Sequence, residues 1–151
     1  MRFLAILFLF GILTSCGSTY SDADKQTFDK KIEVFTRKKG WKMKKLPSGL
    51  YISILQKGAG EEKAKFTSQV KLTYKGTLLN GKVFDNPDPS KPFESPVNGL
   101  IAGFQEALFD QTAGTKFRLI IPPHLGYGDD VLEKIPANSV LVYELELVDV
   151  F

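Results

Sequence analysis

The order of hydrophobic and polar residues divides the chain into stretches of different period. Residues 3–13 form a run without a single polar side chain. Residues 22–39 then place Phe28, Ile32 and Phe35 at helical spacing among charged residues, which predicts a helix that ends at the following glycine. Farther along, apolar residues recur at every second position, which is typical of strands with one buried face.

The alternating part of the chain predicts a sheet and one short helix. Asn80-Gly81 is a strong hairpin signal, and residues 101–109 are the only later stretch long enough for a helix. The predicted strands are residues 50–55, 70–78, 117–121 and 141–151. These elements favour an α+β domain, in which an antiparallel sheet has one face in water and the other packed on the short helix.

The first 15 residues have the pattern of a secretory signal peptide. Arg2 precedes eleven apolar residues, and a helix needs about 20 such residues to span a bilayer. The alternative is a buried core helix, although the run has neither a cap nor an amphipathic face. Leu13-Thr14-Ser15-Cys16 also resembles the bacterial lipobox, which implies cleavage before Cys16 and a lipid on its thiol. The alternative here is a free cysteine beside an ordinary cleavage site. An Asp after the cysteine would resemble the signal for retention in the inner membrane, so Gly17 at that position favours the outer membrane.

Charge and period both change near residue 46. Residues 22–45 hold nine Lys or Arg and four Asp or Glu, whereas residues 46–151 hold ten basic and thirteen acidic side chains. We therefore expect a signal peptide over residues 1–15, a lipid anchor, tether and spacer helix over residues 16–46, and a folded domain over residues 47–151. The basic helix is either a solvated face or a surface that rests on anionic headgroups.

Composition excludes several classes of function. A chain of 151 residues with 43% hydrophobic and 25% charged residues is one globular domain. With one cysteine and one histidine, neither an internal disulfide nor a thiolate or imidazole metal site is expected, and His124 reads as a turn residue. The net charge of +3 gives no reason to expect nucleic acid. No nucleotide or nucleophile motif occurs, so no cofactor is expected.

The remaining candidates are aromatic. Inward positions of separate elements are occupied by Tyr74, Phe84, Phe93, Phe104, Tyr127 and Tyr143. With Leu100, Ile101 and Ile135 they form either an apolar basin with Asp85 at its edge or an ordinary core. The residues alone favour an ordinary core, because aromatic stripes are more often packing than pocket.

The order of short motifs along the chain resembles the FK506-binding-protein family of peptidyl-prolyl isomerases, over about residues 48–151. The motifs are Val70-Lys71-Leu72-Thr73-Tyr74-Lys75-Gly76, Gly81-Lys82-Val83-Phe84-Asp85, Lys91-Pro92-Phe93, Leu100-Ile101-Ala102-Gly103-Phe104, Gly114-Thr115-Lys116, Leu125-Gly126-Tyr127-Gly128, Ile135-Pro136-Ala137-Asn138 and Leu141-Val142-Tyr143-Glu144-Leu145. Each motif is weak alone, and their succession is specific.

The resemblance implies a role for each of these residues. The groups implied to act on the substrate are the Tyr74 and Tyr127 hydroxyls, the Asp85 carboxylate and the Ile101 backbone N–H. The residues implied to line the proline pocket are Phe84, Phe93, Leu100, Phe104, Ile135 and Tyr143. Phe104 stands where the family usually has Trp, Gly99 replaces a frequent acidic residue, and the loops before Phe93 and Ile135 are short.

The resulting expectation is a monomeric, lipid-anchored isomerase of the bacterial envelope, facing the periplasm and acting on proline-containing proteins as they fold. Two alternatives stay open at this stage. One is a non-catalytic module of the same fold that binds a proline-bearing partner in an envelope complex. The other is a structural lipoprotein.

Overall fold

The computed structural model describes residues 20–151, so the predicted signal peptide and Cys16 lie outside the described residues. The helices are α1 (Asp22–Lys39) and α2 (Ala102–Leu108), with single 3-10 turns at η1 (Val97–Gly99) and η2 (Pro123–Leu125). The strands are β1 (Lys44–Lys45), β2 (Tyr51–Gln56), β3 (Gln69–Leu78), β4 (Val83–Asp85), β5 (Phe93–Pro96), β6 (Lys116–Ile121) and β7 (Leu141–Val150).

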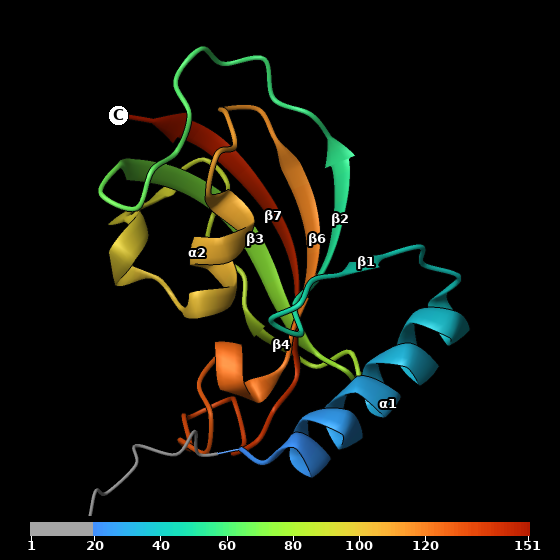
Figure 1. The fold of residues 1–151 in the computed structure, drawn as a ribbon. Coiled ribbons are helices and arrows are strands. Elements are labelled where there is room, and N and C mark those ends of the chain that lie inside the picture. Colours follow the sequence, from blue (N-terminus) through green and yellow to red (C-terminus); the bar gives the residue numbers. More distant parts are fainter. Residues whose placement is uncertain (1–19) are drawn as a thin grey trace, which may run out of the picture.

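These strands form one antiparallel sheet in the order β1-β2-β6-β7-β3-β4, with β5 paired to β3. The last strand, β7, therefore lies in the middle, between β6 and β3 (Figure 1). The predicted hairpin joins β3 to β4. Leu78 donates its N–H to the carbonyl of Lys82 at 2.9 Å, and Gly81 takes the left-handed φ of +87° that this turn requires.

The predicted alternation is confirmed on the inner face of the sheet, which curves around α2 (Figure 1). Leu72 of β3, Leu119 of β6 and Leu147 of β7 are completely buried there, as is Leu108 of α2. The helix approaches closely because it presents Gly103, where a Cβ atom would lie only 2.7 Å from the Ile121 side chain. The antiparallel sheet packed on one short helix is thus confirmed.

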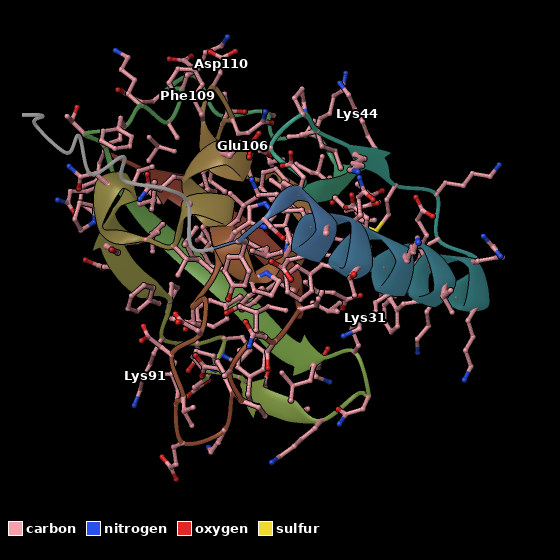
Figure 2. The ribbon with its side chains drawn as sticks, turned by 60° about the horizontal axis from the view of Figure 1, so that its bottom comes forward. Lys31, Lys44, Lys91, Glu106, Phe109 and Asp110 are labelled. Carbon is pink, nitrogen blue, oxygen red and sulfur yellow. The ribbon has the colours of Figure 1, made fainter. Side chains whose placement is uncertain are left out.

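The expectation that the other face is in water is wrong over part of the sheet. Ile32 of α1 is completely buried, and it belongs to a second apolar cluster with Tyr51, Ile120 and Val142 on the outer face. Figure 2 shows α1 lying across the sheet. The signal lay in β6, where Leu119, Ile120 and Ile121 form an unbroken apolar run that buries both faces of the strand.

The N-terminal helix is therefore present as predicted, but it packs on the sheet instead of standing apart as a spacer. Ser21 is its N-cap and forms a capping box with Asp24. Gly40 ends the helix with a φ of +66°, as predicted. A domain boundary between residues 46 and 47 would require residues 47–151 to fold without α1. That boundary stays a prediction, and the contacts of α1 with the sheet argue against it.

Candidate functional site

The predicted site residues come together at one end of the inner face, around Tyr143 of β7. Its ring lies 4.7 Å from that of Phe104 on α2 and 5.5 Å from that of Phe84 on β4, between ring centres. The Tyr74 ring on β3 lies 5.9 Å from the Tyr143 ring and 6.1 Å from the Phe104 ring. All these pairs meet edge to face, the arrangement that aromatic quadrupoles favour.

Phe93 completes this aromatic cluster from the edge strand β5. Its ring lies 6.2 Å from that of Tyr74, while 43% of the residue remains exposed to solvent. Phe104, in contrast, is only 5% exposed. Phe104, one of the residues implied to line the proline pocket, is therefore closed off by its neighbours, and the solvent-facing part of the cluster lies at Phe93 and Tyr74.

A polar pair stands at the rim of the cluster. The hydroxyl of Tyr74 donates a hydrogen bond of 2.8 Å to Oδ2 of Asp85, at the end of β4. Burial, followed by this hydrogen bond, raises the pKa of Tyr74 far above that of a free tyrosine. Tyr74 therefore stays a neutral donor at any physiological pH, and it fixes the position of the carboxylate.

Tyr127 lies just after η2 and reaches the same cluster. The pKa of Tyr143 is raised far above its ordinary value, chiefly because the side chain is buried. The nearby Tyr127 hydroxyl, which is hydrogen-bonded to the Tyr143 side chain, raises this pKa further. A hollow of about 240 Å³ opens beside Tyr127. Its lining residues are Phe84, Asp85, Tyr127, Leu132, Glu133, Lys134 and Ile135.

Leu100 and Ile101 stand at the start of α2, against the same core. The Ile101 carbonyl accepts the first helical hydrogen bonds, from Phe104 at 2.9 Å and Gln105 at 3.1 Å. The backbone N–H of Ile101, in contrast, donates a hydrogen bond to no group within residues 20–151. That N–H is a free donor at the edge of the aromatic cluster, which is the place where the resemblance implies that it receives a carbonyl.

Sequence reasoning missed some of the residues that shape this site. Leu132, Glu133 and Lys134 line the hollow but lie in a polar loop with no periodic pattern. Gly76 matters because a Cβ atom there would lie 2.5 Å from the Phe84 ring and 2.9 Å from the Tyr143 ring. A glycine inside an alternating strand is a recognised sign of such a close approach, so this signal was available.

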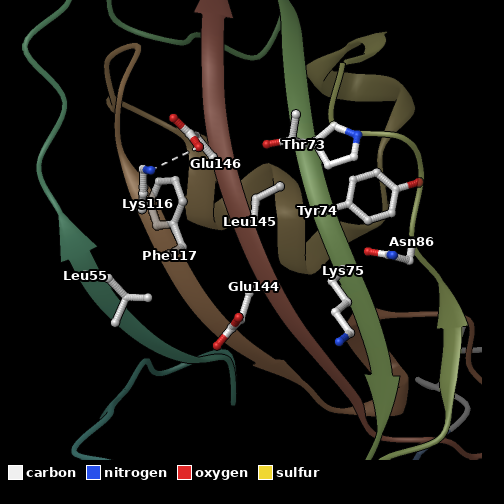
Figure 3. Close-up of a pocket in the computed structure, with 11 residues that line it drawn as sticks. Leu55, Thr73, Tyr74, Lys75, Asn86, Lys116, Phe117, Glu144, Leu145 and Glu146 are labelled. Atoms are coloured by element: carbon white, nitrogen blue, oxygen red, sulfur yellow. Dashed lines mark ion pairs between the residues drawn. The ribbon is translucent and has the colours of Figure 1, made fainter. Parts of the chain in front are cut away.

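A second hollow, of about 280 Å³, lies on the outer face of the same strands (Figure 3). Lys116 pairs with Glu146 at 3.3 Å across neighbouring strands, and Arg118 nearby pairs with Glu144 at 2.9 Å. Lys75 also lines this hollow. Ion pairs that are partly exposed to solvent, such as these two, contribute little to stability.

His124 is part of a turn, as expected. Its Nε2 lies 2.8 Å from the carbonyl oxygen of Ser48, which ties η2 to the loop before β2. In the described part of the chain, no three potential metal ligands of the His, Cys, Asp or Glu type cluster together. Among residues 20–151, no helix is long and apolar enough to cross a membrane.

Comparisons with known proteins point in one direction. A family model described as FKBP-type peptidyl-prolyl cis-trans isomerase matches residues 60–148. The chain is 40% identical over 119 residues to FkpA, an FKBP-type peptidyl-prolyl cis-trans isomerase of Escherichia coli K12, which covers 78% of this chain and 43% of FkpA. The chain thus spans less than half the length of that relative.

Solved structures agree with this similarity. The crystal structure of Escherichia coli FkpA superposes with a TM-score of 0.72 at 38% identity, over 85% of this chain and 60% of that one. A peptidyl-prolyl cis-trans isomerase from Pseudomonas syringae pv. tomato superposes with a TM-score of 0.69 at 30% identity, over 87% of this chain and 98% of that one. The second relative therefore has a size and a fold similar to those of the present chain.

Proposed function

Because the chain belongs to the FKBP-type peptidyl-prolyl cis-trans isomerase family, we propose that it accelerates the rotation of X–Pro bonds in proteins that are folding. The observation that carries the proposal is the aromatic cluster closed around Tyr143, with the Tyr74–Asp85 hydrogen bond at its rim. All the rings of this cluster belong to residues 60–148, the part of the chain that the family model matches.

The mechanism follows from the physics of the amide. Rotation about an X–Pro bond crosses a barrier of about 18–20 kcal/mol, because the twisted bond loses its resonance. Resonance places negative charge on the amide oxygen, and water stabilises that planar form more than the twisted one. An apolar site that excludes water and fits the twisted form lowers the barrier, by about 1.36 kcal/mol for each tenfold gain in rate.

Each polar group has a distinct task in this proposal. The free N–H of Ile101 receives the carbonyl of the residue before the proline, and the hydroxyl of Tyr127 receives a carbonyl nearby. Tyr74 holds the Asp85 carboxylate at the rim, facing the amide as it twists. No proton transfer is required, which agrees with the raised pKa of Tyr74. The aromatic rings and Leu100 and Ile135 supply the apolar wall.

The test is cis–trans conversion of an Ala-Pro peptide by the purified chain and two variants. Tyr74→Phe removes the donor of the rim hydrogen bond, and Asp85→Asn keeps an acceptor oxygen but removes the negative charge; each should lower kcat/KM about threefold to tenfold. Asp110→Asn is the matched control, because Asp110 is an exposed carboxylate paired with Lys63, at the far end of the molecule from Lys91 in the loop after Asp85 (Figure 2).

Two outcomes would count against the proposal. If the wild-type chain does not accelerate the conversion yet binds a prolyl peptide, the chain is a binding module of this fold and not an enzyme. If Asp110→Asn lowers the rate as much as the two rim variants, the rim assignment is wrong.

We further propose that the chain works at the envelope, anchored through lipid on Cys16 and facing the periplasm at the outer membrane. The apolar run before Cys16 and the lipobox-like Leu13-Thr14-Ser15 support this placement. Its clients are then envelope proteins with X–Pro bonds that have not yet reached the native isomer. Mass spectrometry of the membrane fraction should find a diacyl or triacyl mass on a fragment beginning at Cys16, and Cys16→Ser should abolish it. A mature N-terminus at any other residue would end the idea.

A further inference from the structure

Tyr20 is buried although it precedes the first helix, with only 8% of the residue exposed. Its hydroxyl donates a hydrogen bond of 2.7 Å to Oδ1 of Asn138, 118 residues later in the chain. The centre of its ring lies 5.5 Å from the centre of the Phe28 ring on α1, in an edge-to-face arrangement, and 6.4 Å from the centre of the tilted His124 ring of η2. The residue thus joins the start of α1 to the segment between η2 and β7, which run side by side in Figure 1.

The bonded partner of Tyr20 closes a loop. Asn138 donates its N–H to the carbonyl of Gly128 at 2.9 Å, so these two residues form the stem of loop 128–138. Asn138 has a left-handed φ of +58° and Gly128 one of +63°. Asparagine adopts this conformation more readily than most non-glycine residues do, and the Tyr20 hydroxyl holds its side chain in place.

The tip of this loop forms one wall of the hollow beside Tyr127. Leu132 and Ile135 exchange backbone hydrogen bonds of 2.9 and 3.3 Å, which gives the tip a defined shape. Leu132, Glu133, Lys134 and Ile135 all face the hollow. The position of this wall relative to Phe84 and Asp85 therefore depends on how the stem is held.

We propose that Tyr20 is a positioning residue for substrate: by holding the stem at Asn138, it sets the wall at Leu132–Ile135 that contacts the client residues flanking the proline. This inference rests on the proposed isomerase function and deepens it. Tyr20 touches no reacting atom, so its effect falls on binding and on preference for flanking residues, and not on the rotation step itself. The segment next to the predicted anchor then takes part in choosing clients.

The chain offers a matched control in Tyr51. Tyr51 is 5% exposed, and its hydroxyl donates to Oδ1 of Asp29 on α1 at 3.4 Å, so Tyr51→Phe also removes one hydroxyl that links the α1 segment to the rest of the fold. Tyr51 lies on the outer face of the sheet, away from the hollow. Both substitutions keep the ring, so both variants should fold.

The experiment measures kcat and KM for X–Pro peptides with Ala, Leu, Phe, Lys or Glu before the proline. Tyr20→Phe should raise KM about threefold to tenfold, keep kcat within about twofold, and change the order of preference among the five peptides. Asn138→Gly, which keeps the left-handed backbone and removes the acceptor, should reproduce this pattern. The double variant should be no worse than Asn138→Gly alone, because both act through one hydrogen bond.

Amide hydrogen exchange gives a readout that does not depend on catalysis. Exchange at Asn138 and Ile135 should quicken in Tyr20→Phe and stay unchanged in Tyr51→Phe. Equal kinetic profiles for the two tyrosine variants, or a loss in kcat alone, would overturn the proposal. If the wild-type chain proves inactive, faster loop exchange together with weaker binding of a prolyl peptide in Tyr20→Phe still supports the positioning role, and unchanged exchange and binding refute it.

Discussion

Replacing Ile32 by Ala tests whether α1 belongs to the folded core. Ile32 is completely buried against Tyr51, Ile120 and Val142 on the outer face of the sheet. Truncating a buried isoleucine to alanine costs about 2–5 kcal/mol, through lost transfer free energy and the cavity left behind. The better helix propensity of alanine returns only a few tenths of a kcal/mol. We therefore expect the free energy of unfolding to fall by about 2–4 kcal/mol.

Urea denaturation followed by tyrosine and tryptophan fluorescence measures this loss. With an m value of about 2 kcal/mol/M, the midpoint should fall by about 1–2 M while m stays constant. Val34→Ala is the matched control, because Val34 lies two residues later on the same helix and is 62% exposed, so its cost should stay within about 0.5 kcal/mol. A loss below 1 kcal/mol for Ile32→Ala would show that α1 is a spacer after all, and that residues 47–151 fold without it.

Two further predictions follow from burial. Phe104→Ala should lose about 3–5 kcal/mol of stability in the same urea assay, because Phe104 is 5% exposed and packed on Tyr143. A cost near zero would mean that the ring faces solvent. Phe104→Trp, in contrast, should fold and keep its activity towards prolyl peptides. Burial also raises the pKa of Tyr51 to about 12, so the folded state favours the neutral side chain. The contribution of Tyr51 to stability is therefore complete below about pH 10 and is lost as the pH rises towards 12. Tyr51→Phe should flatten that decline in urea midpoints measured from about pH 8 to 11.

The elements that the sequence predicts well are those whose signal is local. Alternation in β3 and β7, the Asn80-Gly81 turn and the Gly40 stop each depend on neighbouring residues, and all are found in the structure. The aromatic candidates follow from inward positions of separate elements, but only the order of motifs indicates that they form one site, since the rings come from β3, β4, β5, α2 and β7 and no local pattern connects them.

What escaped prediction depends on contacts between distant segments. The side of the sheet that α1 covers is decided by Ile120 and Val142, about 90 and 110 residues after Ile32, and a helical pattern alone does not tell which surface will bury it. The wall at Leu132–Ile135 likewise belongs to a loop whose stem residue Asn138 is hydrogen-bonded to Tyr20, 118 residues earlier in the chain.

The central place of β7 determines when the chain is able to fold. Val70 of β3 pairs with Val150, and Lys116 of β6 pairs with Glu146, so both halves of the sheet meet only on the last ten residues of strand. During synthesis from the N-terminus, β3 and β6 therefore each keep one unpaired edge until β7 has been made. Pairing between segments so far apart in the sequence makes folding slow. The loss of β7 would therefore remove the centre of the sheet and not its edge.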